Sequence, residues 1–201
     1  MIARVLSASA FLLVVCPASR ARAADPDVPS DASHAAPRVT LYASAGGGSV
    51  LDKAGGPAPS ATGSIRLALP LARFFALEVS GTSGYAVGRG TPDDLWLRLA
   101  LGLRIEDAHQ ALRPYGAFRL VHIHFAPVST WEAHPGDSIA GSSTEGLQHR
   151  SGTALAAGLS WSFPHTQDRV RAMAEAEVSW VPIGNPPAWF TTVEAGVGYA
   201  F

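Results

Sequence analysis

The chain has 201 residues and a formal net charge of −1, from 15 basic and 16 acidic residues, and 47% of its residues are hydrophobic. This length suits a single domain, and the balanced charge excludes the basic surface that nucleic-acid binding needs. Beyond residue 23 no run of about 18 consecutive apolar residues occurs, so the sequence predicts no transmembrane helix.

Residues 1–23 have the features of a Sec-type signal peptide. Arg4 precedes an apolar segment, Val5–Val15, that is too short to span a membrane, and Ala21-Arg-Ala23 offers a small-x-small cleavage site. Cleavage near Ala23 would remove three of the 15 basic residues and no acid, which leaves 12 basic against 16 acidic residues and a net charge of −4.

The only cysteine, Cys16, lies inside this segment. A lipoprotein signal is the alternative interpretation, but such a signal has a small residue before its cysteine, and Val15 is not small. We therefore expect ordinary secretion of a mature chain without disulfides. Residues 24–37, rich in Pro, Asp, Ser and Ala and without periodicity, are expected to form a disordered periplasmic lead-in.

Alternation of apolar and polar residues recurs through residues 38–201 and predicts β-strands, because successive side chains of a strand point to opposite faces. The clearest case is 95–104, where leucines at odd positions alternate with Trp96, Arg98 and Arg104. The glycine-rich stretch 46–59 is expected to be a loop, and 126–149 the longest loop. Eight strands are predicted, at about 38–44, 62–71, 75–82, 95–104, 114–125, 151–163, 169–181 and 189–201.

Two of these segments are less clear. The stretch 169–181 contains Ala, Glu, Met and Arg, which are strong helix formers, so a helix is the competing interpretation. Apolar residues at its even positions up to Trp180 favour a strand. In 114–125, His122 and His124 share a face with Phe118 and Leu120, and a bulge in this strand would turn the histidines from lipid to lumen.

The last ten residues carry the most characteristic pattern. Val193, Ala195, Val197, Tyr199 and Phe201 lie on one face of the closing strand, and the chain ends on an aromatic residue. This pattern resembles the C-terminal strand of bacterial outer-membrane β-barrels, and the chain as a whole resembles the small eight-stranded members of that family. The resemblance implies that the barrel-assembly machinery recognises Val197, Tyr199 and Phe201 as an assembly signal.

The expected fold is all-β: an eight-stranded antiparallel transmembrane β-barrel formed by residues 38–201. Barrels of this class have short periplasmic turns, longer external loops and both termini in the periplasm. The predicted connections alternate in the same way between longer (44–62, 84–93, 126–150, 181–189) and shorter (71–74, 104–113, 163–169).

Charged residues on the non-lipid faces of these strands are expected inside the barrel. An eight-stranded barrel is just wide enough for side chains to fill, and buried charges are costly unless they are paired. We therefore expect a structural, salt-bridged plug. The alternative is a narrow ion channel that opens when pairs exchange partners. This barrel-interior charge network comprises Arg66, Glu78, Arg98, Arg104, Glu175, Glu177 and Glu194.

Four histidines, His122, His124, His134 and His149, lie on or beside the longest loop. Imidazole is a common metal ligand, and the spacing of His122 and His124 on one strand suits two ligands of one site. Because no dependable third ligand is evident, polar loop histidines are the favoured interpretation. No metal and no cofactor are predicted.

Some eight-stranded outer-membrane barrels are lipid A deacylases or acyltransferases, so the resemblance also raises an enzymatic alternative. A nucleophilic site needs a hydroxyl, a base within hydrogen-bond reach and an orienting acid. Ser129 and Glu132 with His122 or His124 supply these residue types. The deacylases carry His-x-Ser on a strand, whereas this chain reads His122-Ile-His124, so the motif is not met.

The favoured function is therefore non-enzymatic. We expect a monomeric outer-membrane barrel with a structural or surface-interaction role, whose external loops contact lipopolysaccharide or an external partner. The alternatives are the gated ion channel and the lipid A-modifying acyl hydrolase.

Overall fold

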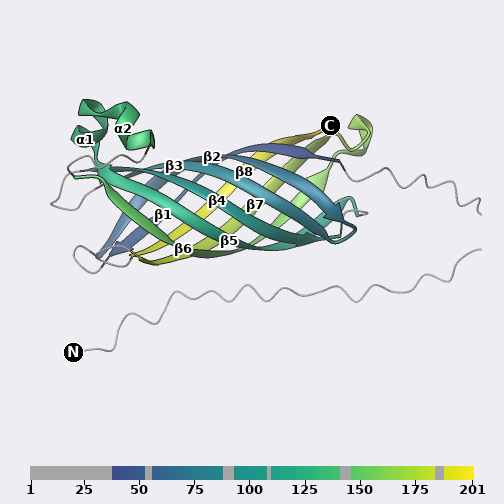
Figure 1. Cartoon of the computed structure of the whole chain (residues 1–201). Helices are drawn as coiled ribbons and strands as arrows, with labels where there is room; N and C mark the ends of the chain where they lie inside the picture. The colour runs from purple at the N-terminus through teal and green to yellow at the C-terminus, as the bar shows by residue number, and fades with distance from the viewer. Residues whose placement is uncertain (1–37, 53–55, 88–92, 108–109, 141–145, 184–187) are drawn as a thin grey trace, which may run out of the picture. The chain divides into compact units, whose positions relative to one another are not determined.

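The computed structural model describes residues 38–52, 56–87, 93–107, 110–140, 146–183 and 188–201. They form a closed antiparallel barrel in which each strand pairs with the next along the chain and β8 returns to pair with β1 (Figure 1). The eight-stranded barrel predicted from the sequence is therefore confirmed. Its strands are β1 (Thr40–Asp52), β2 (Gly56–Ala72), β3 (Phe75–Ala86), β4 (Asp94–Glu106), β5 (Leu112–Pro127), β6 (Gln148–Ser162), β7 (Val170–Ile183) and β8 (Ala188–Ala200).

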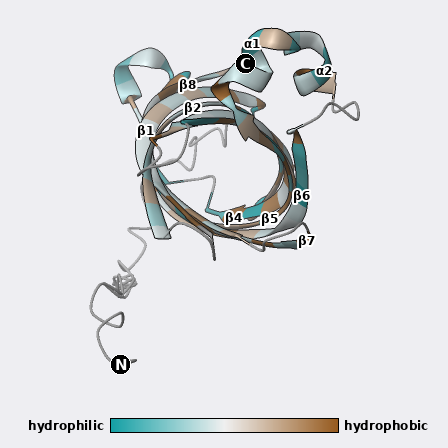
Figure 2. Ribbon diagram, turned by 90° about the vertical axis from the view of Figure 1, so that its left-hand side faces the viewer, coloured by the Kyte–Doolittle hydropathy of each residue, from teal (hydrophilic) through white to brown (hydrophobic). Residues whose placement is uncertain are grey.

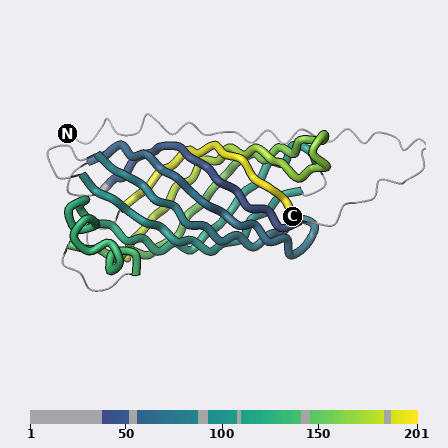
Figure 3. The backbone as a smooth tube through the Cα atoms, turned by 90° about the horizontal axis from the view of Figure 1, so that it is seen from above, coloured from purple at the N-terminus to yellow at the C-terminus, as the bar shows by residue number. Residues whose placement is uncertain are grey.

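In the part of the chain that the structure describes, three short helical segments lie between strands: α1 (Val128–Ala133) and α2 (Pro135–Ala140) follow β5, and η1 (Pro164–Thr166) follows β6. Helices α1 and α2 lie at the end of the barrel opposite the C-terminus (Figures 1 and 3), and we call this the helix end. The other end, where β1 begins beside the last residues of β8, is the terminus end. Among the described residues, no helix is long and apolar enough to cross a membrane.

Side chains alternate between the interior and the outer wall as the sequence pattern predicts. In β4, Trp96, Arg98 and Arg104 are buried, whereas Leu99 and Leu101 are about half exposed on the outer wall. The segment 170–183 is strand β7, so the competing helix is excluded there. Viewed along the barrel axis, the strands form a ring whose wall carries both hydrophobic and hydrophilic residues (Figure 2). An apolar outer band around such a wall suits a lipid environment.

Aromatic pairs mark both ends of the outer band. Trp180 and Trp189 stack across β7 and β8 with ring centroids 6.0 Å apart, toward the helix end. At the terminus end, Trp161 packs against Phe163 and Tyr199 against Phe201, with centroids 5.0 and 5.2 Å apart. Girdles of this kind occur where a membrane barrel meets the two interfaces.

The first hairpin differs from the prediction. Residues 46–48 and 56–59 lie within β1 and β2, so the expected long loop is wrong, and only residues 53–55 separate the two strands. A Cβ on Gly48 would come within 1.7 Å of the Thr191 carbonyl oxygen. Glycine is thus required at this position for the close approach of β1 to β8. Because glycine has a low strand propensity, the sequence pattern wrongly predicts a loop here. The predicted alternation of long and short connections is lost at this hairpin.

Candidate functional site

All seven residues of the barrel-interior charge network project into the lumen, and each is at most 5% exposed. They come from β2, β3, β4, β7 and β8. Arg66, for example, pairs with Glu175 on the far side of the barrel through a 2.6 Å contact between Nη1 and Oε2. Residues far apart in the sequence therefore meet along the barrel axis.

Arg119 of β5 is the centre of this network and was missed by the sequence analysis. Its guanidinium donates to both carboxylate oxygens of Glu175, at 2.8 and 2.6 Å, and to Oε1 of Glu78 at 2.7 Å. It also pairs with Glu177. The sequence does contain the signal, because Arg119 lies on the face of 114–125 opposite the histidines, but alternation alone does not settle which face of that strand points into the lumen.

Arg98 and Arg104 of β4 extend the network along the barrel axis, Arg98 toward the helix end and Arg104 toward the terminus end. Arg98 pairs with Glu177 and donates to Thr82 Oγ1 at 3.0 Å. Arg104 donates to Glu106 at 2.5 and 2.9 Å, and its guanidinium carbon lies 3.5 Å from the centroid of the Tyr115 ring. In this network four buried arginines (Arg66, Arg98, Arg104, Arg119) thus face four buried glutamates (Glu78, Glu175, Glu177, Glu194), and Arg113, Arg150 and Arg171 are buried as well.

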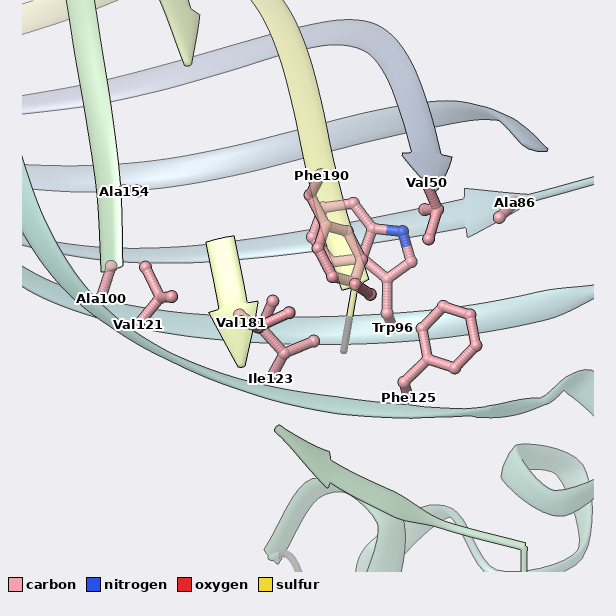
Figure 4. Close-up of a cluster of buried hydrophobic side chains, with 11 residues drawn as sticks. Val50, Ala86, Trp96, Ala100, Val121, Ile123, Phe125, Ala154, Val181 and Phe190 are labelled. Atoms are coloured by element: carbon pink, nitrogen blue, oxygen red, sulfur yellow. The ribbon is translucent and has the colours of Figure 1, made fainter. Parts of the chain in front are cut away.

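Toward the helix end the lumen is mainly apolar, although the buried guanidinium of Arg150 lies over the Phe125 ring. Trp96, Phe125 and Phe190 meet edge to face, with centroids of Phe190 at 5.6 Å from Trp96 and 6.3 Å from Phe125. Ile123 and Val181 fill the space beside them and are fully buried (Figure 4). We call this cluster the apolar layer. The prediction of a charged plug did not include it, although Trp96 lies on the lumen side of the pattern from which that plug was inferred.

The histidines lie on the outer wall at the helix end. The β5 register runs without interruption against β4 and β6 through His122 and His124, so no bulge turns them inward. The next outward residue toward the terminus end is Leu120, which is 57% exposed. Along β5 the outward residues therefore change from apolar to imidazole at His122, whereas its β4 partner Leu99 is still an exposed apolar residue.

Three of the four histidines converge there, and we call His122, His124 and His149 the histidine cluster. Their potential ligand nitrogens lie within 4.8 Å of one another. Nε2 of His122 and Nε2 of His124 are 3.0 Å apart, and His149 is the cross-strand partner of His124. This third imidazole is the ligand that the sequence analysis could not identify, because only the pairing of β5 with β6 brings it in.

Two further groups orient the cluster. Nδ1 of His124 lies 3.0 Å from the carbonyl oxygen of Ser138 in α2, and His124 is buried beneath that helix. Nδ1 of His122 lies 2.8 Å from Oγ of Ser151, its register partner in β6. A hydroxyl and an imidazole at this distance can also serve as nucleophile and base.

The residues considered for catalysis from the sequence do not assemble. Ser129 and Glu132 lie in α1, and it is Ser151 that contacts His122. His134 is exposed and lies 4.0 Å from Asp137 rather than in the histidine cluster. At the other end of the barrel, Val197, Tyr199 and Phe201 all point outward from the end of β8 and are 42–67% exposed.

No protein-family model and no curated protein matches the chain. Solved structures share its fold. Neisserial surface protein A has a TM-score of 0.64 at 15% identity, over 81% of this chain and 97% of that one. OprG from Pseudomonas aeruginosa has a TM-score of 0.53 at 13% identity, over 82% and 96%. Ail, the attachment invasion locus protein of Yersinia pestis, gives 0.50 at 13%, over 82% and 99%. The chain thus has the fold of the small eight-stranded outer-membrane β-barrels.

Proposed function

We propose that this protein is an outer-membrane barrel with a closed lumen, which has a structural or surface-interaction role through its external loops. The observation that supports this role is the filling of the lumen. The four arginines and four glutamates occupy its middle, and the apolar layer occupies the helix end. An ion crossing this barrel would have to break paired charges and then pass the buried aromatic rings of the apolar layer, and both steps are costly.

The gated channel is the alternative that conductance tests directly. Purified barrel inserted into planar bilayers should give no discrete current steps. Steps that change in size when Arg98→Ala or Glu175→Gln is introduced would overturn the closed lumen and establish the channel. Glu132→Gln, an exposed change in α1, is the matched control for altered net charge.

The acyl hydrolase is a second candidate, and the 2.8 Å contact between Ser151 and His122 is the specific observation in its favour. In this arrangement Ser151 would attack an acyl ester while His122 takes the hydroxyl proton, and the ester C–O bond would break as His122 returns that proton to the leaving alcohol oxygen. Water would then hydrolyse the acyl-serine, and His124 would orient His122. The lipid A mass spectrum of outer membranes with and without the protein tests it. If the wild type removes one acyl chain and Ser151→Ala abolishes this removal, the acyl hydrolase would replace the non-enzymatic proposal. An unchanged lipid A mass spectrum supports the non-enzymatic proposal.

The proposed partners follow from the location. Lipopolysaccharide or an external protein would meet the helix end if the termini are periplasmic, as in barrels of this class. The barrel-assembly machinery would meet Val197, Tyr199 and Phe201 at the terminus end.

A further inference from the structure

We propose that the histidine cluster binds a divalent transition-metal ion of the kind that prefers imidazole, with Zn²⁺ as the representative ion. His122, His124 and His149 supply three nitrogen ligands, and a fourth position is left for water. Three protein ligands plus one open position is a recognised coordination pattern for zinc. This inference uses the outer wall of β5 and β6 together with α2, and it is independent of the closed lumen.

The hydrogen bonds of His124 fix which of its nitrogens is available. The Ser138 carbonyl can only accept a hydrogen bond, so Nδ1 of His124 carries the proton. In the neutral imidazole Nε2 then has a free lone pair, and it points toward His122. A second hydrogen bond that holds the ring of a histidine ligand in this way is usual in metal sites.

The partner of His122 allows either tautomer. Without a metal ion, the Ser151 hydroxyl can donate to Nδ1 of His122 while Nε2–H of His122 donates to His124. With a metal ion at the two Nε2 atoms, the ring proton of His122 lies on Nδ1, and this N–H donates a hydrogen bond to Oγ of Ser151. Because a hydroxyl is both donor and acceptor, the contact between Nδ1 of His122 and Oγ of Ser151 can be kept in both states.

The distances between the histidine nitrogens are close to those between the ligands of a bound zinc ion. Zinc–nitrogen bonds of about 2.0–2.1 Å separate two ligands of a tetrahedral site by roughly 3.3–3.4 Å. The two Nε2 atoms are 3.0 Å apart, so a small opening of this pair suffices. His149 has to move further, since ligand atoms of the cluster are up to 4.8 Å apart, but its side chain is exposed and can rotate.

Charge and donor type select the class of ion. The cluster contains only neutral nitrogen donors, which suit zinc, copper and nickel, whereas magnesium and calcium require oxygen ligands. A serine–histidine nucleophile would leave the convergence of His149 unexplained, because its base needs only one orienting partner, and His124 already occupies that position.

Zinc binding to the whole barrel in detergent micelles tests the proposal. The protein is prepared without a polyhistidine tag, treated with chelator and titrated with Zn²⁺ by calorimetry at pH 7.5. We expect one ion per barrel, at least tenfold weaker binding in each of His122→Ala, His124→Ala and His149→Ala, and no heat with Mg²⁺. Ser151→Ala should weaken binding by about tenfold, the lower limit for a group that orients a ligand.

His134→Ala and His165→Ala are the matched controls, because both histidines are exposed and lie outside the cluster. Heat-dependent gel migration establishes that every variant is folded. Nitrogen hyperfine coupling in the electron paramagnetic resonance spectrum of bound Cu²⁺, lost in His124→Ala, would support direct imidazole coordination. Absence of Zn²⁺ binding by the folded wild type, or equal affinity in the cluster variants and the controls, would overturn the proposal.

Discussion

Glu175 and Glu194 are direct cross-strand partners on the lumen face of β7 and β8. Like charges in this arrangement destabilise a sheet unless a cation lies between them. Arg66 supplies that cation from β2, with contacts of 2.6 Å to Glu175 and 3.6 Å to Glu194. Serine and threonine hydroxyls from β1 and β2 also donate to Glu194, at 2.7–2.9 Å. The pairing of neighbouring strands thus depends on residues across the barrel.

Glu175 is the acid whose removal should cost the most stability. Arg66, Arg119 and Tyr115 all contact it, so Glu175→Ala leaves two buried guanidinium groups with fewer partners. Removing one partner of a buried pair costs about 3–5 kcal/mol, and we expect a loss of that order in the free energy of unfolding. Urea titration of the refolded barrel measures it. The control is Glu132→Ala, an exposed change that should alter stability by no more than about 0.5 kcal/mol; equal stability of the two variants would contradict a structural role for the network.

Gly102 tests how the lumen makes room for Arg119. The two residues are cross-strand partners, and a Cβ at Gly102 would lie 2.7 Å from Cγ of Arg119 and 2.3 Å from the Phe118 carbonyl oxygen. Gly102→Ala should therefore lower the free energy of unfolding by about 1–3 kcal/mol, as overpacking does. Gly116→Ala is the control, because its Cβ would meet only an oxygen 3.9 Å away. The same urea titration compares the two variants. Similar free energies of unfolding would show that the close approach of Gly102 to Arg119 does not limit stability.

The sequence predicted the strands and the inward direction of most charges because both depend on alternation along a single segment. What it could not predict depends on pairing between segments. Ser151 and His149 join the histidines of β5 only through the β5–β6 register. The extension of β1 through Gly48 depends on contact with β8. Helices α1 and α2, of six residues each, lie in the stretch 126–149, which is expected to be a loop because it is rich in Gly, Ser, Pro and His.

The orientation of the barrel can be tested by cysteine labelling. If both termini are periplasmic, α2 at the helix end faces the outside of the cell and η1 at the terminus end faces the periplasm. Asp137→Cys and His165→Cys introduce a thiol at an exposed position in each. A membrane-impermeant maleimide should label the first in intact cells and the second only after the outer membrane is permeabilised. The reverse pattern would place the termini outside.

Phe201 is the residue whose loss should affect assembly more than stability. It points outward beyond β8, is 67% exposed and contacts Tyr199, so it contributes little to the packed lumen. If the assembly machinery reads the end of β8, Phe201→Ala should strongly reduce the amount of heat-modifiable barrel recovered from outer membranes. The same variant refolded in detergent should match the wild type in urea titration. Phe75→Ala removes an outward aromatic residue that lies on β3 rather than on the closing strand, and it should leave the recovered amount unchanged. An equal decrease in both variants would assign the effect to the aromatic girdle instead of to a C-terminal signal.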